Sequence, residues 1–133
     1  MRINIFWLNL NFFSSKIRYK TKVENIIIKN KLQDNVEILG VKTGREKEYF
    51  FRQADIFCFP SYYECENYPI VIIEAMKYSL AIISTNWRAI PDIIEDGKTG
   101  LLIPIKEHNI LKEKIELLTQ VDRPKYLSGF NKL

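Results

Sequence analysis

Residues 55–85 read DIFCFPSYYECENYPIVIIEAMKYSLAIIST, and this stretch decides the fold. The apolar run at 56–59 is short and is ended by a proline, as expected of a strand that is covered on both faces. A helix is expected over 69–79, because proline is well suited to the first helical turn. The apolar residues 80–85 then form the next strand. Strand, helix and strand in this order predict two parallel strands joined by a crossover helix.

The flanking sequence continues this alternation. Further strands are predicted at 4–13, 36–39 and 101–103, and further helices at 16–33, 44–53, 89–94 and 107–119. The fold class is therefore α/β: a Rossmann-like parallel sheet with helices on both faces. Ligands of such sheets bind beyond the carboxyl ends of the strands. The loops after Phe59, Thr85 and Ile103 are the places where a site is expected.

The composition is that of one ordinary globular domain. The 133 residues contain 47% hydrophobic and 27% charged residues, which excludes disorder and collagen-like structure. Lys and Arg number 20 against 16 Asp and Glu, and the sequence pI is about 9.0. Because the basic residues are dispersed among acids, no nucleic-acid partner is expected. We treat residues 1–133 as a single domain.

The cysteines, the one histidine and the amino-terminal segment exclude several classes of function. Cys58 and Cys65 make neither a disulfide framework nor a zinc pair, and Cys58 is expected to be buried. His108 has no neighbouring partner for nucleophilic chemistry. The apolar part of residues 1–13 is too short to cross a membrane and lacks a cleavage site. A cytoplasmic protein is predicted, with peripheral contact at the inner face of the membrane as the alternative.

Two glutamates around one helix start form the candidate site. Glu66 closes the loop after the strand at 56–59, and Glu74 lies eight positions further on, inside the predicted helix. At 3.6 residues per turn, eight positions correspond to an offset of about 80°. The free N–H groups at the helix start favour an anion such as phosphate. A carboxylate deeper in the cleft can accept hydrogen bonds from two neighbouring hydroxyls, as acidic residues do from the ribose in nucleotide-binding α/β folds. The ligand would be phosphorylated at one end and polyhydroxylated at the other.

A purely structural interpretation of these residues is also open. Glu66 can be a plain loop acid, Glu74 an exposed helix residue, and Arg88 a surface arginine instead of a bidentate phosphate ligand. Against this, Glu74 follows the apolar run at 70–73. A carboxylate in a helix that is apolar nearly all round is costly unless a ligand or partner satisfies it.

The order of the motifs resembles a known family. DIFCFPS at 55–61 is followed by Glu66 and Glu74, then by AIPDII at 89–94 and DGKTGLL at 96–102. This series resembles the donor-nucleotide half of the family-4 (group 1) retaining glycosyltransferases, which have the two-domain GT-B architecture. The two glutamates match that family's E-x7-E motif. The resemblance implies a Rossmann-like domain that forms the carboxyl-terminal half of such an enzyme.

The resemblance also implies roles for the matching residues. Glu66 would be catalytic, contacting hydroxyls of the transferred sugar and supporting charge near the anomeric carbon, and Glu74 would bind the ribose. Independently of the resemblance, the aromatic residues Tyr62, Tyr63 and Tyr68 are expected to frame a sugar pocket instead of a base-stacking platform. Donor binding as a whole is assigned to Asn67, Tyr68, Pro69, Ile70, Glu74 and Arg88. No metal ligand is expected, because no cluster of acids that could bind a metal is visible in the sequence. No cofactor is expected, because the donor, a UDP- or GDP-sugar, is itself a substrate.

The implied function is transfer of a sugar, with retention, in the synthesis of a polysaccharide, lipopolysaccharide or glycolipid. A nucleotide sugar is the expected partner, together with an acceptor-domain protein or a second copy of the chain. The alternative is a non-catalytic nucleotide-sugar-binding subunit, or an inactive remnant of such an enzyme.

The sequence departs from the family at several positions. The likeness covers about residues 35–118, the start at 1–33 diverges, and the tail at 121–133 is irregular. The acceptor domain is missing, and the first βα unit with its Arg and Lys is expected to be missing too. The chain thus resembles a truncated carboxyl-terminal portion that is incomplete on its own.

Glycine is also replaced at loop positions. Asn67, Ser79 and Arg88-Ala89 stand where the family usually has glycine. Asn tolerates left-handed backbone better than most residues, so the turn at Asn67 can keep its shape.

Overall fold

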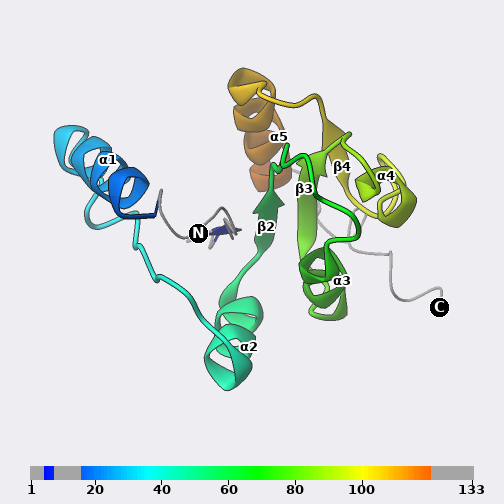
Figure 1. Cartoon of the computed structure of the whole chain (residues 1–133), viewed down its shortest axis with the longest axis horizontal. Helices are drawn as coiled ribbons and strands as arrows, with labels where there is room; N and C mark the ends of the chain where they lie inside the picture. Colours follow the sequence, from blue (N-terminus) through cyan, green and yellow to red (C-terminus); the bar gives the residue numbers. More distant parts are fainter. Residues whose placement is uncertain (1–4, 8–15, 121–133) are drawn as a thin grey trace.

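The computed structural model describes residues 5–7 and 16–120, and the predicted parallel sheet is present in it. The sheet has four strands in the order β1 (Ile5–Trp7), β2 (Ile56–Phe59), β3 (Ala81–Thr85) and β4 (Leu101–Ile103). Each strand runs parallel to its neighbours. The carboxyl ends of all four strands therefore meet at one edge of the sheet (Figure 1).

Five helices are formed in the described residues. They are α1 (Lys16–Lys29), α2 (Gly44–Gln53), α3 (Ile70–Lys77), α4 (Ile90–Ile93) and α5 (His108–Gln120). Each falls within or close to a helix that the sequence predicts, so the alternation of strands and helices is confirmed.

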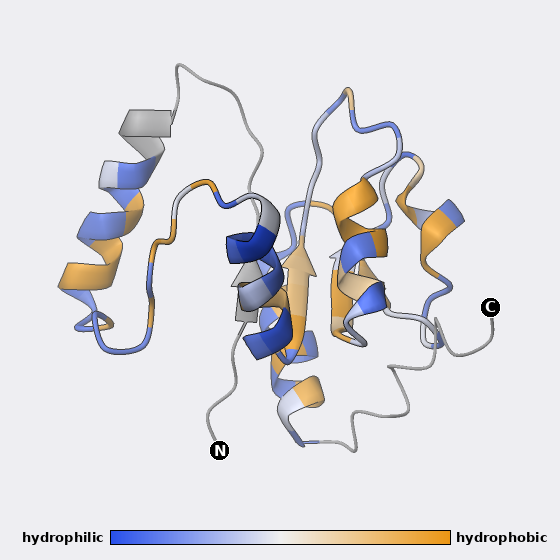
Figure 2. Cartoon of the chain, turned by 90° about the horizontal axis from the view of Figure 1, so that it is seen from below, coloured by the Kyte–Doolittle hydropathy of each residue, from blue (hydrophilic) through white to orange (hydrophobic). Residues whose placement is uncertain are grey.

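Helices cover both faces of the sheet, as predicted. On one face, Phe57 of β2 and Ile82 of β3 pack in a buried cluster with residues of α2, α3 and α4. On the other face, Cys58 and Ile83 pack with Leu118 of α5. Alternate residues of a strand point to opposite faces, which explains why β2 and β3 are apolar without interruption. Figure 2 shows a largely hydrophilic α2 beside a largely hydrophobic α3.

The strand predicted at 36–39 is not formed, so that prediction is wrong. Residues 36–43 have no regular secondary structure, and the side chains of Val36 and Ile38 are exposed. A strand needs a neighbouring strand to satisfy its backbone N–H and C=O groups. The segment instead connects α1 to α2 (Figure 1), and its Leu39 packs against the buried cluster around Phe57. The pattern of apolar residues predicted an extended strand, but it did not reveal that no neighbouring strand among the described residues pairs with this segment.

The amino-terminal part also differs from expectation. One βα unit precedes the motifs, because β1 lies parallel to β2 and is followed by α1. That the family's own first βα unit, with its Arg and Lys, is missing stays a prediction. The strand predicted at 4–13 is confirmed at 5–7; its other residues lie outside the described part of the chain, as does the tail at 121–133. The helix predicted over 16–33 ends at Lys29.

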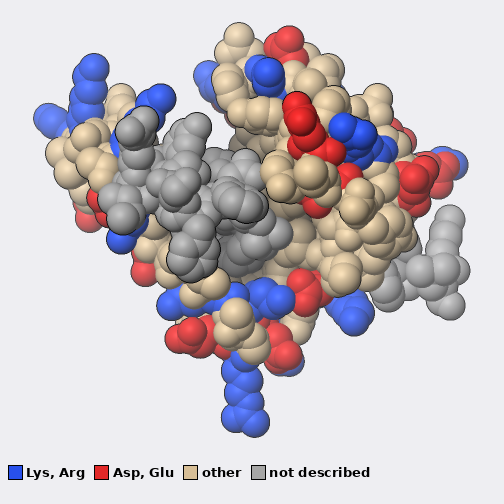
Figure 3. All heavy atoms as spheres, in the orientation of Figure 1, with Lys and Arg blue, Asp and Glu red and all other residues tan. Residues whose placement is uncertain are grey.

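Helix α1 stands apart from the sheet in both ribbon views (Figures 1 and 2). Its Ile26 and Ile28 are exposed. Across the described ranges, no helix has the combination of length and apolar character that a membrane crossing requires. Figure 3 shows acidic and basic side chains mixed over the face that it presents.

The turn between α4 and β4 depends on one aspartate and two glycines. The Asp96 carboxylate accepts a hydrogen bond from the N–H of Leu102 at 2.9 Å. Gly97 has a left-handed backbone with a φ of 75°. A Cβ atom on Gly100 would lie 3.1 Å from the carbonyl oxygen of Ile82. The DGKTG sequence therefore fits a turn that packs closely against β3.

Candidate functional site

The loop after β2 is held by side chains from the end of β3. Three hydrogen bonds connect side-chain donors there to main-chain carbonyl oxygens of residues 59–63. The pairs are Ser84 Oγ to Phe59 at 2.7 Å, Thr85 Oγ1 to Ser61, and Trp87 Nε1 to Tyr63 at 2.8 Å. Because Ser84 and Thr85 are buried, these bonds fix the loop at the carboxyl edge of the sheet. The sequence analysis assigned no role to any of the three donors.

Glu66 occupies the predicted position just before α3. The Ser61 hydroxyl donates a hydrogen bond to its Oε2 atom at 2.9 Å. The Glu66 side chain is half-buried, and the Glu66 N–H donates to the carbonyl oxygen of Tyr63 at 3.1 Å. The carboxylate is therefore oriented by its own loop at the point where the helix begins.

The start of α3 is open. Pro69 is buried and precedes the first helical residue, and no side chain caps the helix there. The side chains of Tyr68 and Ile70 are 53% and 67% exposed, and Asn67 is exposed as well. The backbone N–H groups of a first helical turn carry partial positive charge and lack intrahelical acceptors. The helix start is therefore accessible, and its binding of an anion stays a prediction.

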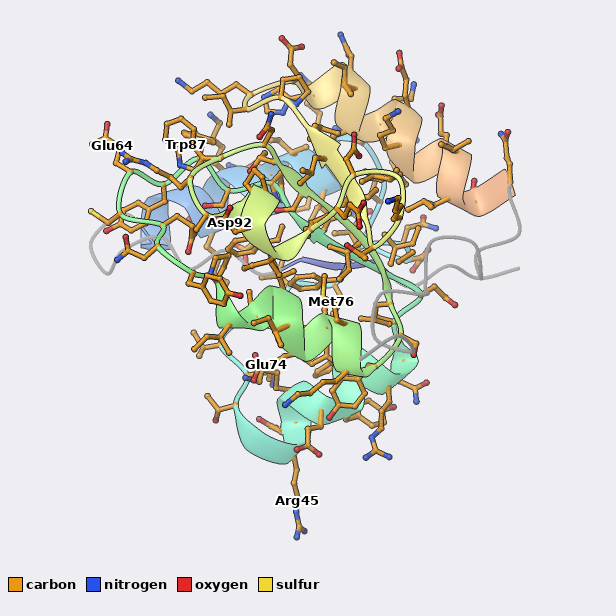
Figure 4. All side chains as sticks on the ribbon, turned by 90° about the vertical axis from the view of Figure 1, so that its right-hand side faces the viewer. Arg45, Glu64, Glu74, Met76, Trp87 and Asp92 are labelled. Atoms are coloured by element: carbon orange, nitrogen blue, oxygen red, sulfur yellow. The ribbon has the colours of Figure 1, made fainter. Side chains whose placement is uncertain are left out.

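Glu74 lies on the side of α3 that faces α2 (Figure 4). The Lys47 ammonium of α2 contacts its Oε1 atom at 2.8 Å. The two side chains are 26% (Lys47) and 32% (Glu74) exposed. The expectation that a carboxylate here needs a partner is thus met by Lys47, which the sequence analysis missed. The signal was a lysine in the predicted helix 44–53, whose position beside α3 depends on the fold.

The two carboxylates have separate partners. Glu66 is bound by Ser61 and Glu74 by Lys47. The structure places Glu66 next to the start of α3, whereas Glu74 lies one turn into the same helix and faces α2. A ligand that contacts both would extend along α3 with its anionic part at the helix start.

Left-handed backbone occurs at two of the four positions where the family usually has glycine, but not at Asn67, where it was expected. Ser79 and Arg88 have φ values of 56° and 51°. Asn67 is not among the described residues with positive φ, so the expectation of a left-handed turn there is wrong. The exposed Arg88 guanidinium lies 5.3 Å from the ring centroid of Trp87. It lies in the loop after β3, and among residues 5–7 and 16–120 no acidic side chain forms an ion pair with it.

An open cavity lies between the loops after β2, β3 and β4, as expected for this sheet. It has a volume of about 480 Å³ and is lined by Tyr62, Tyr63, Glu64, Cys65, Trp87, Ile105 and Lys106. The Lys106 ammonium lies 5.2 Å from the Tyr62 ring centroid. Figure 4 shows Glu64 and Trp87 together on this side of the molecule.

The two cysteines differ in their surroundings. Cys58 is buried in β2, and burial raises the pKa of its thiol to about 12. Cys65 is exposed at the cavity. A hydrogen bond with Cys65, and then the charge of that side chain, raise the pKa of the Tyr63 phenol. In the described part of the chain, no three His, Cys, Asp or Glu residues are grouped as metal ligands would be.

The sheet with its strand-end site defines a Rossmann-like α/β domain, and solved structures share it. A crystal structure of Anabaena Alr3699/HepE in complex with UDP and glucose matches 94% of the chain and 32% of its own chain, with a TM-score of 0.78 and 20% identity. The carboxyl-terminal domain of a Francisella tularensis group 1 glycosyl transferase, LpcC, matches 90% of the chain and 60% of its own, with a TM-score of 0.75 and 22% identity. These likenesses show the fold.

The chain belongs to the glycosyl transferases group 1, whose family model matches residues 16–127. The family likeness thus begins further toward the amino end than the motifs indicated. A putative colanic acid biosynthesis glycosyltransferase of Escherichia coli is 28% identical over 108 residues, which are 78% of this chain and 27% of that protein. An uncharacterised glycosyltransferase of Methanocaldococcus jannaschii is 36% identical over 107 residues, 80% of this chain and 30% of that protein. The chain thus spans less than a third of the length of these relatives.

Proposed function

We propose that this chain binds the nucleotide-sugar donor of a retaining glycosyl transfer. The observation that carries the proposal is the arrangement of Glu66 just before α3 and Glu74 within α3, each oriented by a partner of its own. The open helix start between them suits a diphosphate, because its N–H groups and its dipole favour negative charge. The UDP and glucose in the matching Anabaena structure support a donor of this class.

In this proposal, different residues bind different parts of the donor. Glu74 binds the ribose hydroxyls, the first turn of α3 with Asn67 and Tyr68 binds diphosphate and sugar, and Arg88 adds a cation. Glu66 contacts the sugar hydroxyls and stabilises positive charge near the anomeric carbon as the nucleoside diphosphate leaves. Backbone dipoles and a guanidinium can offset the charge of the leaving group, so we propose that transfer needs no resident metal. A chelator should then leave donor binding unchanged.

The product would be a polysaccharide, lipopolysaccharide or glycolipid. This part of the proposal is supported by relatives named for colanic acid biosynthesis and for phosphatidyl-myo-inositol mannosyl transfer. We propose that the reaction takes place in the cytoplasm or at the inner face of the membrane. Catalysis would also require acceptor-binding residues, supplied by an acceptor domain or a partner chain.

A thermal-shift titration tests the proposal. UDP, GDP, ADP and their sugar conjugates are added to the chain, to Glu74→Ala, and to Glu116→Ala, whose glutamate is exposed on α5. A ligand at 100 times its dissociation constant stabilises by about 2.7 kcal/mol. One nucleotide class should raise Tm by several degrees in the wild type and in Glu116→Ala, but not in Glu74→Ala. A folded wild type that responds to none of these ligands would contradict the proposal.

A further inference from the structure

We propose that Lys47 is a positioning residue of the donor site, which holds the Glu74 carboxylate in the orientation that accepts the ribose hydroxyls of the nucleotide. The inference rests on the proposed function, because it requires a nucleotide at Glu74. It adds a residue on a different helix, α2, that the sequence motif does not contain.

The Lys47–Glu74 contact differs from the other ion pairs of the described residues. Its two residues are 27 positions apart and belong to two helices, and the atoms Nζ and Oε1 are 2.8 Å apart with both side chains mostly shielded. Lys112 and Glu116 are 3.8 Å apart within one helix, and their side chains are 74% and 58% exposed. Exposed pairs of that kind restrict a side chain little. A short, shielded, charge-assisted hydrogen bond restricts it strongly.

The contact leaves the carboxylate able to bind a ligand. An ionised carboxylate has two oxygens with about four acceptor positions, and the lysine occupies one of them at Oε1. Within residues 5–7 and 16–120, no hydrogen bond to Oε2 is recorded. A vicinal diol donates two hydrogen bonds, one toward each oxygen. The lysine and the diol can therefore bind the same carboxylate together.

The orientation of Glu74 is otherwise weakly determined. Its neighbours toward the core, Ile72 and Ala75, are fully buried and apolar, so they offer the carboxylate no polar contact. Without Lys47 the Glu74 side chain would turn outward to water. Nucleotide binding would then have to return the side chain to its binding orientation and restrict its rotamers, which weakens the affinity. Lys47 thus fixes the acceptor before the ligand arrives.

The test is a set of calorimetric titrations of the 133-residue chain with UDP, 2′-deoxy-UDP and 3′-deoxy-UDP, and with GDP and its deoxy analogues in parallel. The measured quantity is the ratio of the Kd for the deoxy analogue to the Kd for the parent nucleotide. A hydroxyl bonded to a charged group should make this ratio about tenfold or more in the wild type. It should fall to about twofold in Lys47→Met and be restored in Lys47→Arg.

Lys112→Met is the matched control, because it removes a lysine that pairs with a glutamate outside the site. It should keep the wild-type ratio. Lys47→Gln gives a second neutral variant in case the Met variant does not fold. Circular dichroism of each variant confirms that the titrated protein is folded.

Three outcomes would overturn the inference, and they can be told apart. If folded Lys47→Met keeps the wild-type ratio while Glu74→Gln loses it, the donor site is real but Lys47 does not position Glu74. If Lys47→Met weakens the parent and deoxy nucleotides equally, the lysine contributes only charge or stability. If the folded wild type binds neither UDP nor GDP, the proposed function fails and the inference fails with it.

Discussion

The indole Nε1 of Trp87 donates a hydrogen bond to the carbonyl oxygen of Tyr63 at 2.8 Å. This contact joins the loop after β3 to the loop after β2 at the rim of the cavity. It completes the series of three bonds that begins in the buried Ser84. At the rim, side chains at the end of β3 and just after it therefore donate hydrogen bonds to main-chain carbonyl oxygens of residues 59–63.

Replacing Trp87 by Phe should loosen the rim without unfolding the domain. The variant keeps an aromatic ring but loses one donor, and a net hydrogen bond contributes about 0.5–1.5 kcal/mol. Hydrogen exchange followed by mass spectrometry should show faster exchange at residues 62–66 and no change in α5. Equal exchange in both proteins at residues 62–66 would show that the bond does not hold the loop.

Replacing Ser79 by Gly should stabilise the protein. Ser79 follows α3 with a φ of 56°, and its N–H bonds to the carbonyl of Met76 while that of Leu80 bonds to Ala75. These bonds form a Schellman motif, in which glycine is preferred at the left-handed position. Relief of the strain should add about 0.5–1 kcal/mol, measured by urea unfolding. Ser79→Ala is the control, since alanine keeps the Cβ and should give no gain.

Replacing Ser61 by Ala should separate sugar binding from nucleotide binding. The variant removes the donor that orients Glu66 but leaves Lys47 and Glu74 in place. Titration should show weaker binding of the UDP- or GDP-sugar, by roughly three- to tenfold on the scale of one hydrogen bond. Binding of the free nucleotide should not change. A parallel loss for both ligands would mean that Ser61 supports the loop as a whole.

Replacing Gly100 by Ala should destabilise the fold. The added Cβ would lie 3.0 Å from the Ile94 side chain and 3.1 Å from the Ile82 carbonyl oxygen, and the oxygen belongs to a central strand. Overpacking of this kind costs about 1–3 kcal/mol, so the midpoint of urea unfolding should fall. Gly40→Ala is a useful comparison, because Gly40 has no atom within 4 Å of its Cβ position and carries only the cost of its φ of 69°.

The fold could be predicted from the sequence because its buried strands and amphipathic helices have periodic patterns. The apolar runs that became β2 and β3 are continuous, since both faces of each strand are buried. The segment at 36–39 also has apolar residues in a pattern that suits a strand, yet it forms no strand. Strand pairing depends on residues distant in sequence, and no local pattern encodes it.

The site was predicted only in part. The positions of Glu66 and Glu74 in the fold could be predicted, because Glu66 follows a strand and Glu74 lies in an apolar helix. Their roles in donor binding stay predictions. The roles of Ser84, Thr85 and Lys47 could not, because each depends on which distant atom lies beside it. The glycine replacements show the same limit, since left-handed backbone is present at Ser79 and Arg88 and not at Asn67. The type of a residue indicates whether it tolerates left-handed backbone, but the geometry of the turn determines where that backbone occurs.

The difference between the two cysteines gives the chain a built-in attachment point for spectroscopy. Burial keeps the Cys58 thiol protonated at neutral pH and out of reach of reagents, whereas Cys65 is exposed. The sequence has no further cysteine. A maleimide fluorophore would therefore label the native protein at one position, on the rim of the cavity between the strand-end loops. Its emission could follow the filling of that cavity in real time, with no residue replaced.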